Sequence, residues 1–204
     1  APDTQILAFY PQDGVSEMQR LQMVTQEGGN VGVCAIRGNF DDAQTGVKTL
    51  FTDPAVIRRL ADKGKRFSSA NSINWGRLLP QIVYYVSAYL DLLRDGALGT
   101  DGVFDVAVPT GNFGNILAAY YARRMGVPIR RLICASNRNR VLTDFFETGV
   151  YDGIRPFYTT TSPSMDILVS SNLERLIYHL SGDDSGVVAD LMAKMKKDRR
   201  YAVP

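Results

Sequence analysis

Short apolar runs alternate with amphipathic stretches along most of the chain. The alternation is clearest in the middle, where an apolar run at 103–108 and another at 131–135 flank a helical pattern over 114–125. A strand, a helix and a strand at this spacing form a βαβ unit whose strands pair in parallel. The pattern therefore predicts an α/β fold in which helices flank a largely parallel sheet.

Further strands and helices are predicted on both sides of this unit. Strands are expected at 6–10 and 30–37. Ser16 is a suitable N-cap for the first helix, and Gly28-Gly29 ends that helix before the second strand. Helices are expected at 16–27, 41–51, 54–64, 76–94, 141–147, 167–180 and 184–199.

Composition and charge narrow the function classes. Hydrophobic residues make up 45% of the chain and charged residues 22%, which is typical of an ordinary globular protein. A net charge of +2 is too small to imply a nucleic-acid or membrane partner. Cys34 and Cys134 lie in apolar strand-like runs and are interpreted as reduced core residues of a cytoplasmic protein. The single histidine, His179, rules out a multi-histidine metal site and argues against a Ser-His-Asp triad, so no metal site is predicted.

The strongest motif lies between the predicted strand and helix of the central βαβ unit. Glycines in such a turn let backbone N–H groups approach an anion, and the amides of a helix N-terminus attract a phosphate. A tight turn capped by an asparagine is the alternative interpretation. The motif reads Pro109-Thr110-Gly111-Asn112-Phe113-Gly114-Asn115.

Other phosphate-binding loops do not fit this turn. A dinucleotide fingerprint needs a third glycine and an acidic residue near the end of the next strand, but that strand ends Ala135-Ser136-Asn137-Arg138. A Walker A loop is excluded because no Gly-Lys-Ser/Thr follows. The remaining hypothesis is a compact cradle for one phosphate, of the kind that holds pyridoxal phosphate.

Two other polar stretches have both a functional and a structural interpretation. Ser72, Asn74 and Arg77 place hydroxyl, amide and guanidinium groups just before a helix, which suits either an oxyanion or ordinary helix capping. Asp41-Asp42 favours capping of a helix N-terminus over metal or acid–base chemistry.

The phosphate-loop motif, continued by Ile116-Leu117-Ala118, resembles the cofactor-phosphate loop of the threonine synthases. These are pyridoxal-phosphate enzymes of the tryptophan synthase β-like fold. The resemblance covers nearly the whole chain and includes four further stretches in the same order and spacing. They are 15–20, 38–44, 69–74 and 162–167.

The resemblance implies a cofactor, a reaction and a set of ligands. The cofactor is pyridoxal 5'-phosphate, and the reaction converts O-phospho-L-homoserine and water to L-threonine and phosphate. The partner is thus a small-molecule substrate, and a homodimer is a possible assembly. Ser72, Asn74 and Arg77 are expected to bind the substrate phosphate. The residues expected to bind the cofactor phosphate are Gly111, Asn112, Phe113, Gly114 and Asn115.

The same resemblance predicts that the chain is an internal fragment of such an enzyme. In the family the cofactor-binding lysine lies upstream of the segment that matches Ile6, so no catalytic residue is assigned and the fragment is expected to be inactive. Residues 1–66 would end the smaller α/β domain, and 67–204 would form part of the larger, phosphate-binding one. The alternatives are another pyridoxal-phosphate lyase of this fold, such as a threonine or serine dehydratase, and a non-catalytic phospholigand-binding module.

Overall fold

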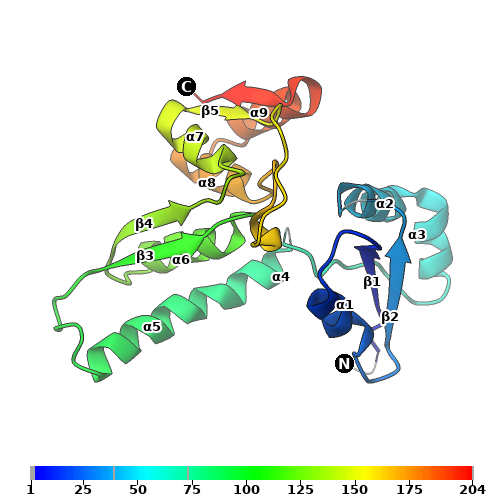
Figure 1. Cartoon of the computed structure of the whole chain (residues 1–204), viewed down its shortest axis with the longest axis horizontal. Helices are drawn as coiled ribbons and strands as arrows, with labels where there is room; N and C mark the ends of the chain where they lie inside the picture. Colours follow the sequence, from blue (N-terminus) through cyan, green and yellow to red (C-terminus); the bar gives the residue numbers. More distant parts are fainter. Residues whose placement is uncertain (1–2, 39, 73, 204) are drawn as a thin grey trace. The chain divides into compact units, whose positions relative to one another are not determined.

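The computed structural model describes residues 3–38, 40–72 and 74–203 (Figure 1). Asn39 and Ile73, which belong to two of the stretches compared with the family, lie outside the described residues, as does the side chain of Asp41. The chain divides into two compact units, Ala1–Ser68 and Ser69–Pro204. Assigning these units to the smaller and larger domains of an enzyme stays a prediction.

The described residues of the first unit form one parallel strand pair and three helices. Its strands pair with Ile6 opposite Val31 and Pro11 opposite Ile36. Ser16 caps the first helix as predicted, in a reciprocal capping box with Gln19. The elements are β1 (Ile6–Pro11), α1 (Glu17–Val24), β2 (Val31–Ile36), α2 (Phe40–Thr52) and α3 (Pro54–Ala61).

One core prediction for this unit is wrong. Cys34 is a free thiol, but it lies exposed on β2. The reason is that a two-stranded sheet has only edge strands and little area to bury. Among the described residues of the first unit, only Tyr10 and Pro11 are buried.

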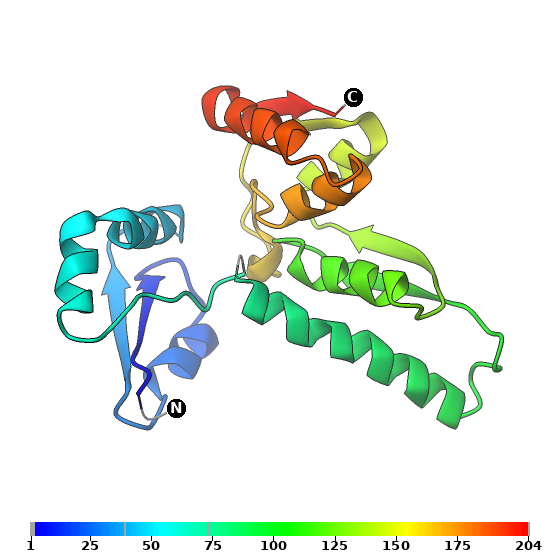
Figure 2. The same cartoon turned by 180° about the vertical axis from the view of Figure 1, so that it is seen from behind.

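The second unit contains the predicted βαβ arrangement. Strand β3 pairs in parallel with β4, with Val106 opposite Leu132 and Pro109 opposite Ala135. Helix α6 lies against these strands, and α5 runs alongside α6 (Figure 2). The α/β fold class with parallel strands is therefore confirmed. The elements are α4 (Trp75–Leu78), η1 (Leu79–Gln81), α5 (Ile82–Arg94), β3 (Phe104–Pro109), α6 (Gly114–Arg124), β4 (Ile129–Ala135), α7 (Val141–Thr148), β5 (Val150–Asp152), η2 (Pro163–Met165), α8 (Leu173–Leu180), α9 (Ser185–Asp198) and β6 (Arg200–Ala202).

The core of the second unit forms around α6. Leu117, Ala118, Ala119 and Ala122 on this helix are fully buried. Small side chains on the buried face let neighbouring elements approach the helix closely. The packing of α6 in turn fixes the position of its N-terminus, where the predicted phosphate loop ends. No helix in the described part of the chain combines the length and apolarity that crossing a membrane requires.

Two of the predicted helices differ most from those observed, although α1 and α3 also end three residues before their expected ends. The single helix expected at 76–94 is divided into α4, η1 and α5, because Pro80 has no N–H to continue an α-helical ladder. The helix expected from 167 begins only at Leu173. Residues 170–172 instead direct hydrogen bonds to loops elsewhere in the unit, as described below. The antiparallel pair of β5 and β6 was not predicted from the sequence.

Candidate functional site

The turn between β3 and α6 leaves the N-terminus of α6 without a side-chain cap. Phe113 is the N-cap residue and adopts a left-handed backbone, with φ 64° and ψ 5°. Asn112 and Asn115 do not cap the helix, so the asparagine-capped turn considered above is not what forms. Among the described residues, no side chain accepts a hydrogen bond from the first amides of α6. These amides and the helix dipole favour an anion at this position.

The left-handed backbone at Phe113 is unusual for a bulky residue. The ring of Phe113 is only 4% exposed. It lies 6.0 Å from the ring of Phe146, measured between centroids. Burial of the aromatic ring offsets the backbone strain and holds the turn in this conformation.

Gly111 and Gly114 have different environments. A Cβ added to Gly111 would lie 2.8 Å from the carbonyl oxygen of Ser164, closer than real Cβ atoms approach backbone. A Cβ added to Gly114 would meet the Asn172 amide nitrogen at 3.5 Å, an ordinary contact. Neither glycine has a positive φ. Gly111 is therefore required by the close passage of the η2 segment over the turn, a constraint that the sequence did not show.

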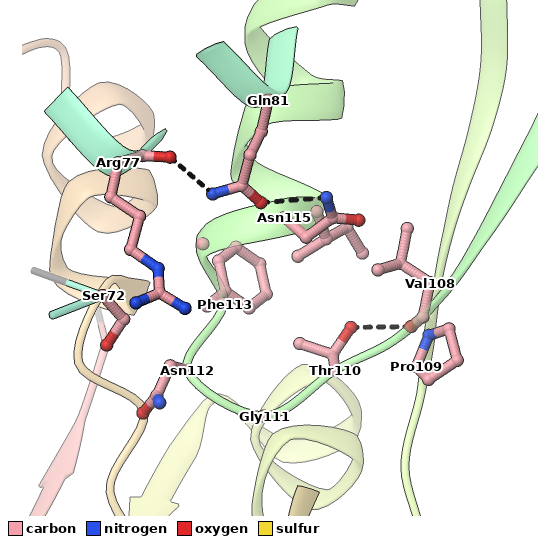
Figure 3. Close-up of a pocket in the computed structure, with 12 residues that line it drawn as sticks. Ser72, Arg77, Gln81, Val108, Pro109, Thr110, Gly111, Asn112, Phe113 and Asn115 are labelled. Atoms are coloured by element: carbon pink, nitrogen blue, oxygen red, sulfur yellow. Dashed lines mark hydrogen bonds between the residues drawn. The ribbon is translucent and has the colours of Figure 1, made fainter. Parts of the chain in front are cut away.

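A cavity of about 180 Å³ lies beside this turn (Figure 3). Its wall includes residues of the 110–115 turn together with Ser72, which precedes α4, and Arg77, which lies on α4. The structure thus brings together the two stretches that the sequence singled out for anion binding. The lining residues are Ser72, Arg77, Gln81, Val108, Pro109, Thr110, Gly111, Asn112, Phe113, Gly114, Asn115 and Ile116.

Arg77 is the cationic side chain of the cavity wall. One guanidinium nitrogen donates to the Ala70 carbonyl at 2.8 Å. A guanidinium has five N–H donors, so this bond orients the group and leaves others for a ligand. In Figure 3 the guanidinium points toward Ser72, whose hydroxyl lies 3.3 Å from that of Ser171. Arg77 and Ser72 together can bind a phosphate or another oxyanion.

Asn74 has a local structural role. Its side-chain oxygen accepts from the Gly76 amide at 2.8 Å and caps α4. Its amide nitrogen donates to the Ser69 carbonyl. The capping interpretation therefore describes Asn74, which shapes the stretch between the two residues that line the cavity.

Gln81 and Tyr85 belong to the site but were not among the predicted site residues. The Tyr85 hydroxyl lies 2.6 Å from the side-chain oxygen of Asn115 and donates to it. The Asn115 amide donates to Gln81 at 3.0 Å, and the Gln81 amide donates to the Arg77 carbonyl at 2.7 Å. This chain of hydrogen bonds links the turn to the stretch that carries Arg77. Gln81 lies four residues after Arg77, the spacing of neighbours on one face of a helix, and this was the one sequence signal that could have identified it.

Burial favours the protonated form of two groups near the turn. It raises the pKa of Tyr85 to about 12, further above neutral pH than the ordinary value, which is consistent with the hydroxyl donating to Asn115. Burial also raises the pKa of the Cys134 thiol, although a hydrogen bond with Thr110 opposes the shift. Cys134 therefore stays a thiol at neutral pH and is not an activated nucleophile.

Thr110 anchors the start of the turn to β3 and β4 through hydrogen bonds. Its backbone N–H donates to the Ala135 carbonyl at 2.8 Å and extends the pairing of the two strands. Its hydroxyl donates to the Val108 carbonyl at 2.7 Å, and the residue is 6% exposed. Because the single hydroxyl proton is directed at the Val108 carbonyl, the Thr110 side chain supports the turn and does not donate to an anion in the cavity.

The arrangement as a whole is suited to an anion, and none of the described residues that line the cavity is a lysine. The three lysines of the second unit all lie on α9, at Lys194, Lys196 and Lys197, and none lines the cavity. No group of three or more metal-binding side chains gathers among the described residues. The donors in the cavity wall are of the kind that phosphate groups accept from, and covalent chemistry at a bound ligand would need groups beyond those in the wall.

The chain is similar in sequence to threonine synthases and threonine synthase-like proteins. It is 46% identical over 200 residues to human threonine synthase-like 1, covering 97% of this chain and 27% of the relative. It is 45% identical over 198 residues to threonine synthase of Pseudomonas aeruginosa, covering 97% of this chain and 40% of the relative. No protein-family model matches the chain.

The structural comparison agrees with the sequence comparison. The crystal structure of pyridoxal-phosphate-bound threonine synthase from Brucella melitensis matches with a TM-score of 0.83 at 41% identity. The match covers 99% of this chain and 41% of that one. In sequence and in fold, the chain is therefore homologous to a segment of the threonine synthases.

Proposed function

We propose that this chain is a segment of a pyridoxal-phosphate-dependent threonine synthase. The enzyme would convert O-phospho-L-homoserine and water to L-threonine and phosphate. The observation that carries this proposal is the single cavity whose wall includes both the uncapped N-terminus of α6 and Arg77 with Ser72. A reaction in which cofactor and substrate each bring one phosphate group needs two neighbouring anion-binding elements.

The turn before α6 fits the phosphate of the cofactor. Its residues 111–115 offer uncapped backbone amides beside the cavity, and the helix dipole adds to their attraction for an anion. Tyr85 and Gln81 fix the side chain of Asn115 at the edge of the same turn. When bound, pyridoxal phosphate supplies an electron sink for carbanion chemistry.

The stretch from Ser72 to Arg77 is suited to the phosphate of the substrate. Arg77 contributes charge and several donors, Ser72 contributes a hydroxyl, and Asn74 holds the backbone between them. Charge-assisted hydrogen bonds from a guanidinium to phosphate are among the strong polar contacts of proteins. The role inferred for these residues is to anchor the substrate while its other end reaches the cofactor.

The lysine that the cofactor chemistry requires is inferred to lie outside these 204 residues. The lysines of the second unit lie on α9, and none of them lines the cavity. In the first unit, Lys65 donates to Gln5 at 2.9 Å, and Lys48 donates to Gln44 at 3.3 Å. The chain also spans only 40% of the P. aeruginosa enzyme that it matches.

Substrate choice tests the proposed function against a dehydratase of the same fold. The whole enzyme, loaded with pyridoxal phosphate, should release inorganic phosphate from O-phospho-L-homoserine and form L-threonine in equal amount. Release of an oxo acid from L-threonine or L-serine, without turnover of the phosphorylated substrate, would assign the dehydratase reaction instead. Failure to bind the cofactor would favour a phospholigand-binding module.

Arg77→Ala should impair the use of the substrate without impairing the binding of the cofactor. Loss of a charge-assisted hydrogen bond is worth about 1.5–3 kcal/mol, so kcat/KM should fall roughly ten- to hundredfold. Cofactor content, measured by absorbance, should stay at the wild-type level. Arg94→Ala is the matched control, because Arg94 is exposed at the end of α5 and pairs with Asp91. A loss below about twofold for Arg77→Ala would show that Arg77 has only a structural role.

A further inference from the structure

The segment 170–172, just before α8, contacts both anion-binding stretches. The Ser170 hydroxyl donates to the Gly111 carbonyl at 2.9 Å. The Asn172 side-chain amide donates to the carbonyl of Asn112 at 2.9 Å and to the carbonyl of Ser72 at 3.0 Å. One amide group therefore joins the turn at 110–115 to the stretch that begins at Ser72.

Asn172 uses all of its hydrogen-bonding groups in this position. The residue is 0% exposed. Its backbone N–H donates to the Asn112 carbonyl at 3.1 Å, and its side-chain oxygen accepts from Arg175. An asparagine amide has two N–H donors, and here each meets a carbonyl of a different loop. A buried amide with every group satisfied holds its partners in one geometry.

Ser171 adds a weaker link between the same two stretches. Its hydroxyl lies 3.3 Å from the Ser72 hydroxyl and 3.4 Å from the side-chain oxygen of Asn112. The three consecutive residues thus contact Gly111, Asn112 and Ser72. This use of the segment also explains why it is not helical: its polar groups bond to distant loops.

We propose that the segment 170–172, with Asn172 at its centre, is a positioning element that fixes the spacing between the two anion-binding stretches. The inference rests on the proposed function, because it assigns one stretch to the cofactor phosphate and the other to the substrate phosphate. A substrate anchored by its phosphate reaches the cofactor only if this spacing is correct. A displacement of about 1 Å between reacting groups can cost roughly a hundredfold in rate.

The test compares three variants of the whole enzyme. Asn172→Asp keeps the size and the oxygen that faces Arg175, but it places an oxygen opposite two carbonyl oxygens. Ser170→Ala removes only the bond to the Gly111 carbonyl. Leu191→Ala is a control for lost stability, because Leu191 is 4% exposed on α9, which packs against α8 and β6. The measurements are pyridoxal-phosphate affinity by absorbance titration, KM for O-phospho-L-homoserine at saturating cofactor, and the thermal midpoint.

Each variant has a distinct expected result. Asn172→Asp should weaken cofactor affinity and raise KM, because it places an oxygen opposite the two carbonyl oxygens that now accept from the amide. Each change should be about tenfold, which corresponds to about 1.4 kcal/mol. Ser170→Ala should weaken cofactor affinity by about three- to tenfold and leave KM within twofold. Leu191→Ala should lower the thermal midpoint and leave both constants within twofold. Ser170→Ala should therefore change cofactor affinity alone, whereas Asn172→Asp should change both cofactor affinity and KM. General destabilisation does not produce this difference.

The proposal is overturned if Asn172→Asp lowers only the thermal midpoint, or changes one constant without the other. If Asn172→Asp does not fold, the same measurements on Ser171→Ala test the proposal. That variant should change both constants by about two- to threefold in the same direction, and unchanged constants would overturn the proposal. A wild-type enzyme that neither binds pyridoxal phosphate nor turns over the substrate would instead refute the proposed function.

Discussion

The 204-residue chain by itself should release no phosphate from O-phospho-L-homoserine above the uncatalysed rate. Enzymes commonly accelerate reactions by about a millionfold or more, so the expected loss is total on the scale of an assay. A lyase of this class needs a lysine at the reactive carbon of its cofactor to transfer protons. The lysines of the second unit, at Lys194, Lys196 and Lys197, are absent from the cavity wall.

Anion binding should survive in the isolated chain even though turnover does not. The uncapped amides at the start of α6 are held by local backbone and by the core of the second unit. Titration with inorganic phosphate, followed by NMR of the amides at 111–115, should show weak saturable binding. The whole enzyme is the positive control for turnover. Steady phosphate release by the purified chain would contradict our placing of the lysine outside it.

Gly111→Val in the whole enzyme should reduce pyridoxal-phosphate affinity by about a hundredfold. A Cβ at this position would already lie 2.8 Å from the Ser164 carbonyl oxygen, and valine adds two methyl groups. Either the η2 segment or the turn must move. A shift of the turn misaligns the amides that are proposed to bind the cofactor phosphate, and a small misplacement of such donors has a large effect.

Absorbance of bound cofactor, measured across a titration, checks the effect of Gly111→Val. Gly99→Val is the matched control, because a Cβ at Gly99 meets nothing within 4 Å. It should bind cofactor like the wild type. Unchanged affinity in Gly111→Val would show that the turn does not hold the cofactor phosphate. Equal loss in both variants would indicate a general effect of valine on folding.

The central βαβ unit was determined by local sequence. Apolar runs at 103–108 and 131–135 are long enough for strands, and the helical pattern between them fits α6 (Gly114–Arg124). Gly126 ends that helix with a positive φ of 106°. Strand and helix periodicity depends on neighbours a few residues apart, so the fold class could be predicted without tertiary information.

The sequence also predicted that residues 110–115 bind an anion, which stays a prediction, but it did not show how this turn is built. The sequence suggested glycine freedom and asparagine donors. The structure instead places the left-handed backbone at Phe113, which buries its ring, and requires Gly111 because Ser164 passes close to it. Each of these features depends on segments that are distant in sequence, so no local pattern could reveal them.

The boundaries and partners of the site were decided by tertiary structure alone. Residues 167–172 have a helical pattern, yet Ser170 and Asn172 bond to Gly111, Asn112 and Ser72 instead. A buried amide with distant carbonyl partners outweighs the modest local preference for helix. The sequence by itself determined the βαβ unit and predicted an anion-binding turn within it. The long-range hydrogen bonds and close packing that join this turn to Arg77 in one cavity exist only in the folded chain, because their partners lie far apart in sequence.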